Sequence, residues 1–153
     1  MAHAHNYQAL VTWKGSGTPS YQAYTREYEF SVGDKAVIRG SADPHFRGDA
    51  TLYNPEELLV VALSTCHLLS YLAECARGGV NVIAYEDDAH GRMDMKDGAI
   101  RFIDVLLRPR VTIAPESDVE KAKALHVKAH AECFIANSVN FPVRNEPTIV
   151  VGS

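Results

Sequence analysis

Cysteines are the residues of this chain whose type and spacing could most readily do chemistry. Cys66 and Cys75 lie in one apolar stretch, and Cys133 lies near the end of a later one. A count of three is odd and low, which argues against the disulfide framework of a small secreted protein. In a reducing compartment such thiols are buried spectators, metal ligands or redox centres. We expect Cys75 to be a spectator, whereas for Cys66 and Cys133 both a spectator role and a chemical role stay open.

The element that must position the first thiol is a helix predicted over residues 55–77. Asn54 is a favourable N-cap and Pro55 suits the first helical position, while Gly78-Gly79 ends the helix. The helix is apolar on nearly every side, so we expect it to be buried at the centre of the fold. Because one small sheet cannot cover such a helix, we expect a homodimer in which two copies share one core.

Helix geometry limits which thiols can meet. Cys66 and Cys75 lie about 13 Å apart along one axis and cannot bridge within a straight helix. Cys133 therefore has the most freedom to meet Cys66. A thiol in apolar surroundings resists ionisation, so a reactive Cys66 needs a cation from another segment. The adjacent His67 points about 100° away round the helix and does not supply it.

Two arginines are candidates for that cation. Arg47 lies in the polar loop of residues 41–53, and Arg26 lies on the aromatic face of a predicted strand; a solvated surface charge is the alternative for each. Glu56, in the first helical turn, either interacts with the helix dipole or holds an arginine in a bidentate pair. About 15 Å of helix separates Glu56 from Cys66. Either an extended arginine spans that gap or a partner chain supplies one end.

A metal site is the rival interpretation of the same residue types. Its ligands would come from His67, His126, His130, Cys66 and Cys133. The sequence contains neither C-x-x-C nor H-E-x-x-H, so we expect no bound metal. It also lacks a G-x-S-x-G elbow and a glycine-rich phosphate loop, which argues against a serine hydrolase and against a nucleotide cofactor.

Length and composition exclude further classes of protein. The chain has 153 residues, 46% of them hydrophobic and 22% charged, which is typical of one globular domain over residues 1–153. A net charge of -4 without a basic run argues against nucleic acid and membranes as partners. The N-terminus lacks a signal-peptide pattern, and polar residues interrupt the longest apolar stretch. We therefore expect a cytoplasmic protein.

The rest of the chain predicts an α+β fold with antiparallel sheets packed on the long central helix. A second helix is expected over residues 117–132, ending at Cys133. Residues 80–95 and 99–113 form the arms of a long hairpin. Strands are further predicted over residues 6–14, 21–32, 35–40 and 141–151, and two prolines make the last of these an edge strand.

Two motifs make the chain resemble a known family. Asn54-Pro55-Glu56-Glu57-Leu58-Leu59 precedes Cys66, and the second cysteine lies in Ala129-His130-Ala131-Glu132-Cys133. This pattern resembles the OsmC/Ohr family, the osmotically inducible and organic hydroperoxide resistance proteins, over nearly the whole chain in element order. Residues 40–48 and 138–143 resemble an OsmC-like subgroup of thiol peroxidases more than the Ohr branch.

The resemblance implies an intertwined homodimer with two active sites at its interface and a cysteine-based peroxidase activity on organic hydroperoxides. Cys66 matches the peroxidatic cysteine, Cys133 the resolving cysteine, and Glu56 the glutamate that fixes an activating arginine. The Ohr arginine lies in the glycine-rich turn after the first strand, and that turn has no arginine here. Arg47 or Arg26 must therefore substitute for it.

The resemblance further implies that no cofactor is needed and that an external thiol reductant resets the site, either a dithiol such as a lipoylated protein or the monothiol glutathione. Apolar neighbours would favour an alkyl or lipid hydroperoxide; the residues expected there are Leu59, Leu63, Leu69, Phe46 and Phe134. Two other functions stay open. One is a binding protein for an apolar ligand with unreactive cysteines, and the other is a thiol-dependent hydrolase.

Overall fold

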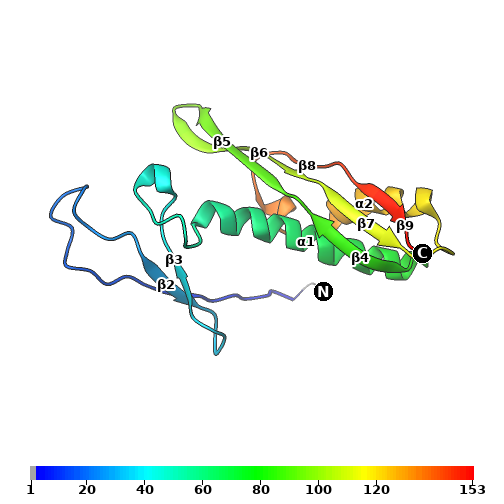
Figure 1. The fold of residues 1–153 in the computed structure, drawn as a ribbon, viewed down its shortest axis with the longest axis horizontal. Coiled ribbons are helices and arrows are strands. Elements are labelled where there is room, and N and C mark those ends of the chain that lie inside the picture. The colour runs from blue at the N-terminus through cyan, green and yellow to red at the C-terminus, as the bar shows by residue number, and fades with distance from the viewer. Residues whose placement is uncertain (1–2) are drawn as a thin grey trace. The chain divides into compact units, whose positions relative to one another are not determined.

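The structure, a computed structural model, describes residues 3–153. The chain divides after Leu58 into two compact units, and each has its own strands (Figure 1). The expectation of one domain over residues 1–153 stays a prediction.

The first unit contains a small antiparallel sheet. Its strands are β1 (Leu10–Thr12), β2 (Tyr28–Ser31) and β3 (Ile38–Gly40), hydrogen-bonded in the order β1-β2-β3. The strands predicted over residues 6–14 and 35–40 are present but shorter. The strand predicted over residues 21–32 is wrong before Tyr28, because residues 21–27 form turns and irregular backbone.

The helix α1 (Pro55–Gly78) matches the predicted central helix within one residue. Asn54 and Glu57 cap its start reciprocally: the Glu57 amide donates to the Asn54 side chain at 2.8 Å, and the Asn54 amide donates to the Glu57 carboxylate at 3.1 Å. Gly79, at φ +74°, ends it in the left-handed conformation that glycine adopts without strain.

The second unit contains two three-stranded sheets. One has the order β4 (Val82–Asp87), β7 (Pro109–Ile113), β9 (Thr148–Val151), and the other the order β5 (His90–Lys96), β6 (Ala99–Leu107), β8 (Val143–Asn145). β4 pairs with β7 and β5 with β6, all antiparallel, so the predicted long hairpin is confirmed. Each arm of the hairpin is interrupted once, between β4 and β5 in the first arm and between β6 and β7 in the second. At this interruption the Arg108 amide donates to the Asp87 carboxylate at 2.6 Å.

The C-terminal segment predicted as one edge strand forms two, β8 and β9. Each lies at the edge of its sheet, as expected, but pairs in parallel with its neighbour, β6 or β7. Pro147 falls between the two strands. The two sheets of the second unit are therefore mixed rather than purely antiparallel.

Helix α2 (Val119–Glu132) follows the hairpin. Asp118 caps its start by accepting from the Lys121 amide at 2.9 Å, and Cys133 is its C-cap residue. α1 packs against the sheets of the second unit through two separate clusters of buried side chains, and α2 takes part in the first of them. The first cluster is Tyr71, Cys75, Val80, Val111, Ile113, Ala122 and Ala129. The second is Leu63, Val105, Leu107 and Val143.

Polar and apolar side chains of α1 are not separated as in an ordinary amphipathic helix. Its buried stripe includes two polar side chains, His67 and Glu74. The opposite side exposes large apolar side chains, with Val61 55% and Leu69 67% accessible. By length and composition alone α1 could cross a membrane, with 28% of its most apolar window buried, but the core helices of soluble proteins meet the same criterion.

Candidate active site

The structure brings together the two cysteines that the sequence singles out. Cys66 lies half-buried in the middle of α1, and Cys133 lies at the end of α2, 1% exposed. Cys66 lies close enough to Cys133 to influence the ionisation of its thiol. Neither is in a disulfide in this structure. An oxidised sulfur on one residue would therefore lie close to the thiol of the other.

The pKa of the Cys133 thiol is raised to about 11, mainly by burial; the Ala136 backbone amide acts in the opposite direction, and the nearby Cys66 adds to the rise. Cys133 is therefore a protonated thiol at neutral pH. A protonated thiol is better suited to react with an already oxidised sulfur than to attack a peroxide.

Cys75 lies apart from this pair. It is 1% exposed and belongs to the first buried cluster, beside Tyr71. Burial raises its pKa as well. The expectation that Cys75 is a structural residue agrees with this position.

A groove of about 420 Å3 is lined by sequence neighbours of both cysteines, although neither cysteine lines it. Leu69 and Ser70 on its α1 side lie one turn beyond Cys66, and Glu132 and Phe134 flank Cys133 in sequence. Phe134 is 79% exposed, so the groove offers apolar surface to a ligand. Its remaining lining residues are Ala73, Arg77 and Asn137.

The apolar residues expected around the reactive cysteine lie in different parts of the structure. Leu69 and Phe134 line the groove, whereas Leu63 and Leu59 belong to the second buried cluster or pack against it. Phe46 lies in the first unit and is exposed.

The two carboxylates that open α1 have different roles. Glu57 is used in the reciprocal cap with Asn54. Glu56 is half-buried, and one of its carboxylate oxygens is buried without a hydrogen-bond partner among the residues that the structure describes. A buried carboxylate oxygen is costly to leave unpaired, so Glu56 is suited to receive a cation.

Arg47 lies in an ordered loop of the first unit. It follows the short 3-10 helix η1 (Pro44–Phe46) and adopts φ +67°, an uncommon conformation for a residue with a side chain. The side chain is exposed, with no ion pair among the described residues. The neighbouring Gly48 packs closely against the backbone of Ala42, because a Cβ at this position would lie 1.5 Å from the Ala42 carbonyl oxygen. This close packing restricts the backbone next to Arg47.

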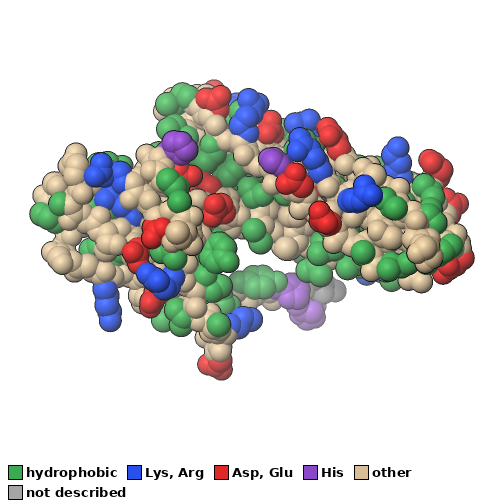
Figure 2. Space-filling model, in the orientation of Figure 1, with side chains coloured by type: hydrophobic (Ala, Val, Ile, Leu, Met, Phe, Trp, Pro, Cys, Tyr) green, Lys and Arg blue, Asp and Glu red, His purple; other side chains and the backbone are tan. Residues whose placement is uncertain are grey.

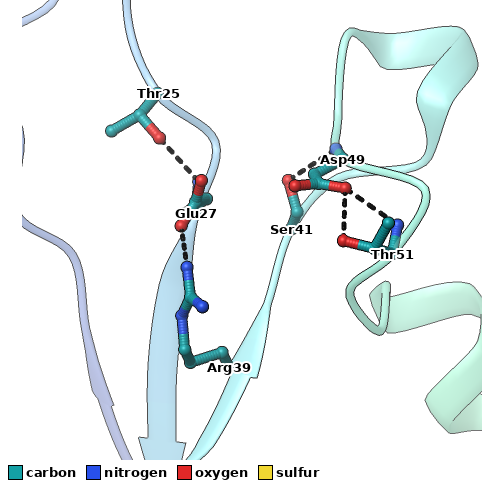
Figure 3. A network of polar contacts seen from close by, with 6 residues as sticks. All are labelled: Thr25, Glu27, Arg39, Ser41, Asp49 and Thr51. Atoms are coloured by element: carbon teal, nitrogen blue, oxygen red, sulfur yellow. Dashed lines mark hydrogen bonds and ion pairs between the residues drawn. The ribbon is translucent and has the colours of Figure 1, made fainter.

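Polar contacts hold the rest of this loop (Figure 3). The Asp49 carboxylate accepts from the Thr51 amide at 2.8 Å and from the Thr51 hydroxyl at 2.7 Å, and the Asp49 amide donates to the Ser41 hydroxyl. These contacts hold the pKa of Asp49 below its usual value. The loop is therefore a defined platform for Arg47.

The Arg26 side chain binds backbone and aromatic groups of its own turn. Its guanidinium donates to the carbonyl oxygens of Tyr21 and Tyr24 and lies 3.8 Å from the centre of the Tyr24 ring. These contacts close the turn that interrupts the predicted strand. They also occupy the donors that a catalytic arginine would present to a substrate.

The histidines of the rival metal interpretation form a different arrangement. His67 Nε2 lies 2.9 Å from His126 Nδ1, so these two atoms hydrogen-bond to each other. No group of three or more His, Cys, Asp or Glu residues within residues 3–153 is arranged to hold a metal ion. The absence of a metal stays a prediction. Sequence reasoning missed the His67–His126 bond because nothing in the sequence says which faces of two distant helices meet.

Comparison with known proteins places this arrangement in a family. The profile described as OsmC-like protein matches residues 48–147. The uncharacterized protein YmaD of Bacillus subtilis (strain 168) is 26% identical over 104 residues, which cover 65% of this chain and 69% of that protein.

Solved structures agree with the profile. An OsmC-like protein of unknown function from Vibrio cholerae is 31% identical, with a TM-score of 0.87 over 95% of this chain and 100% of that one. An organic hydroperoxide resistance protein from Elizabethkingia anophelis, crystallised with thiocyanate, is 16% identical with a TM-score of 0.71 over 99% and 100% of the two chains. At that identity the second likeness concerns the fold alone.

Because the profile spans well over half of the sequence, this chain belongs to the OsmC-like protein family. Its mixed α+β fold with small sheets and two main helices is the fold of that family. The resemblance drawn from the sequence motifs is confirmed at the level of the family, while the subgroup stays a prediction.

Proposed function

We propose that this protein is a thiol-dependent peroxidase that reduces organic hydroperoxides. The observation that carries the proposal is the proximity of the Cys66 and Cys133 thiols across α1 and α2. Membership of the OsmC-like family supports it, and one protein of the same fold is an organic hydroperoxide resistance protein. The apolar groove beside the thiols suits an alkyl or lipid substrate.

The chemistry proceeds in three balanced steps. The Cys66 thiolate attacks the distal peroxide oxygen; the O–O bond breaks, the alcohol leaves with one proton, and Cys66 becomes a sulfenic acid. The Cys133 thiol then attacks that sulfur, which forms a disulfide and releases water. An external dithiol finally reduces the disulfide to two thiols and is itself oxidised to a disulfide.

The activating cation in this proposal is Arg47, with Glu56 as its carboxylate partner. Arg47 is exposed, whereas the donors of Arg26 are occupied by carbonyl oxygens of its own turn. The unpartnered carboxylate oxygen of Glu56 is suited to a bidentate pair with a guanidinium. α1 itself carries one arginine, Arg77, which lies about 16 Å along the helix from Cys66, beyond the reach of its side chain.

The exposed apolar side of α1 supports the proposal of a homodimer. Val61, Leu69 and Leu72 recur at helical spacing on that side and are all exposed in the single chain. A second copy that packed its own α1 against this side would bury them and would wall the groove beside the cysteines.

The charge distribution supports the expectation that nucleic acid is not a partner. On the face shown in Figure 2, acidic and basic side chains of the second unit are interspersed, so this face has no broad basic patch for nucleic acid. We propose a cytoplasmic location and an external thiol reductant, either a dithiol such as a lipoylated protein or two molecules of glutathione. No cofactor takes part in the proposed steps.

Thiol chemistry with cumene hydroperoxide tests the function. One equivalent of peroxide should remove two titratable thiols per chain, and dithiothreitol should restore them. Cys66→Ser should abolish turnover, and Cys133→Ser should give one stoichiometric turnover followed by over-oxidation of Cys66. A wild-type rate no faster than that of Cys66→Ser would reject the peroxidase.

A binding protein for an apolar ligand is the second candidate, and the apolar groove is the observation that favours it. Its cysteines would be unreactive, so one equivalent of hydroperoxide would leave the thiol count unchanged. The same titration therefore decides between the two functions.

A further inference from the structure

A buried histidine pair joins the two helices that carry the cysteines. His67 of α1 and His126 of α2 are each 1% exposed, and their rings approach with Nε2 of His67 2.9 Å from Nδ1 of His126. Tyr71 stacks on the His126 ring at 3.8 Å between centres, with the planes 9° apart. The pair is thus fixed both by a directed bond and by packing.

Each ring depends on this one bond. The two remaining nitrogens, His67 Nδ1 and His126 Nε2, are buried and have no hydrogen-bond partner in the part of the chain that the structure describes. A bond between two imidazoles needs one donor and one acceptor, so the accepting ring is neutral. Burial lowers the pKa of both histidines, which favours the neutral form of the donor ring as well. Loss of the bond would leave a buried polar nitrogen on each helix without compensation, which is unfavourable.

The bond lies beside Cys66 on α1 and about two turns before Cys133 on α2. His67 directly follows Cys66 in α1, and His126 precedes Cys133 by seven residues, about two turns of α2. Two other contacts join these helices: the Tyr71 hydroxyl donates to the Ala122 carbonyl oxygen, and Glu74 pairs with Lys128. Both lie further along α1 from Cys66 than His67 does. On α1 the histidine bond is therefore nearer to Cys66 than either of these contacts, whereas on α2 Lys128 is nearer to Cys133 than His126 is.

We propose that His126, acting through His67, is a positioning residue that holds α2 against α1 with Cys133 within reach of Cys66. Neither histidine touches the reacting sulfurs in this role. The bond fixes how far α2 is shifted and rotated relative to α1, and Cys133 lies at the end of α2, where a small shift of the helix changes its position most.

The role predicts which chemical step suffers when the bond is lost. Attack of Cys66 on an organic hydroperoxide does not involve Cys133. The next step does, because the Cys133 thiol must attack the Cys66 sulfenic acid to form the disulfide and water. Loss of the bond should therefore slow the second step and spare the first; this consequence for turnover rests on the proposed function.

The first test does not depend on peroxidase activity. Oxidised glutathione converts the two thiols to the Cys66–Cys133 disulfide and is reduced to two glutathione molecules, so a glutathione buffer measures the equilibrium constant directly. His126→Phe keeps a ring to stack on Tyr71 but removes the bond. His126→Asn places an amide where Nδ1 was and can restore it. Leu125→Ala, which truncates a neighbouring side chain packed against the first cluster, is the matched control.

We expect His126→Phe to lower the equilibrium constant for the disulfide roughly 10-fold, within the usual range for coupling between two sites. His126→Asn should recover most of that loss, and Leu125→Ala should leave the constant near the wild-type value. A wild-type constant in His126→Phe, or an equal loss in Leu125→Ala, would overturn the proposal. If His126→Phe is unfolded by circular dichroism, His67→Phe removes the same bond from α1, with His67→Gln as its conservative counterpart.

The second test follows one turnover with cumene hydroperoxide. In His126→Phe the first oxidation of Cys66 should keep its wild-type rate, while mass spectrometry should find more Cys66 as sulfinic acid and less as disulfide. A slower first oxidation with an unchanged disulfide yield would overturn the positioning role. If wild-type thiols do not react at all, the peroxidase proposal fails, and the glutathione equilibrium alone decides the role of His126.

Discussion

Glu74 of α1 and Lys128 of α2 form an ion pair that joins the two helices, with the Glu74 side chain 2% exposed and that of Lys128 56% exposed. Arg77 pairs with the other carboxylate oxygen. The hydrogen bond from Lys128 is the main cause that lowers the pKa of Glu74 below its usual value.

We expect Glu74→Gln to lower the melting temperature, because the carboxylate that two cations neutralise is lost. The folded-state pKa is lowered, so the contribution of Glu74 is present above pH 4.5 and is lost as the pH falls through the folded value. The difference in melting temperature between wild type and variant should therefore shrink under acid conditions. Glu132→Gln, at an exposed position of α2, is the control, and a variant as stable as wild type at neutral pH would contradict the expectation.

The histidine pair should make the protein sensitive to mild acid. Burial lowers the pKa of His67 to about 4, with His130 lowering it and Asp87 raising it, and burial lowers the pKa of His126 to about 3. Between pH 6.5 and 4 the unfolded chain therefore binds protons that the folded chain does not. The free energy of unfolding should fall as the pH falls, by about 1.4 kcal/mol per pH unit for each such histidine.

Urea denaturation at one protein concentration between pH 4.5 and 7 measures this slope. His126→Phe removes one of the two groups and should make the dependence shallower by about 1.4 kcal/mol per pH unit. Identical slopes in wild type and variant would show that the pair does not titrate as its burial requires.

A charge on the exposed side of α1 should separate the proposed dimer. Leu69 is 67% exposed, and we expect Leu69→Glu to give a mass near 16.8 kDa by light scattering, where wild type gives twice that value. Met95 in β5 is similarly exposed at 63%, so Met95→Glu is the matched control and should keep the larger mass. A monomeric wild type at micromolar concentration would refute the dimer.

Arg47 should matter for the rate of the first oxidation of Cys66. Removing one preorganised charge from a reaction centre costs roughly 10²-fold or more in rate, so we expect a loss of that size in Arg47→Ala. Arg47→Lys should recover little of it, because an ammonium cannot form the bidentate pair. Stopped-flow measurement with cumene hydroperoxide gives this rate. Arg26→Lys is the comparison, and a larger loss there than in Arg47→Ala would exchange the roles of the two arginines.

Local signals in the sequence were enough to predict the helices. Asn54, Pro55 and the glycines at 78–79 mark the ends of α1, and Asp118 marks the start of α2, because caps are satisfied by residues close in sequence. The hairpin pairing also followed from one turn at Asp97-Gly98, where both residues have positive φ. The family motif identified both cysteines for the same reason: it is a pattern of residue types at fixed spacing.

The remaining features depend on contacts between distant parts of the chain. Alternation predicted a strand from Tyr21, but the guanidinium of Arg26 binds carbonyl oxygens there and closes a turn instead. Hydrophobicity predicted a helix buried on all sides, but it could not say that His67 and Glu74 would face inward. Those two face α2, and the sequence does not show which residues of α2 lie opposite them.

His67 lies on α1 between Leu63 and Tyr71, one turn from each, so a polar layer divides the apolar interior into two bodies. In an interior divided in this way, one buried cluster can open locally while the other stays packed. The sulfur pair lies at the level of the dividing layer. In the proposed peroxidase, a local fluctuation of this kind would admit a bulky hydroperoxide to Cys66 and then return Cys133 to it, while most of the fold stays intact.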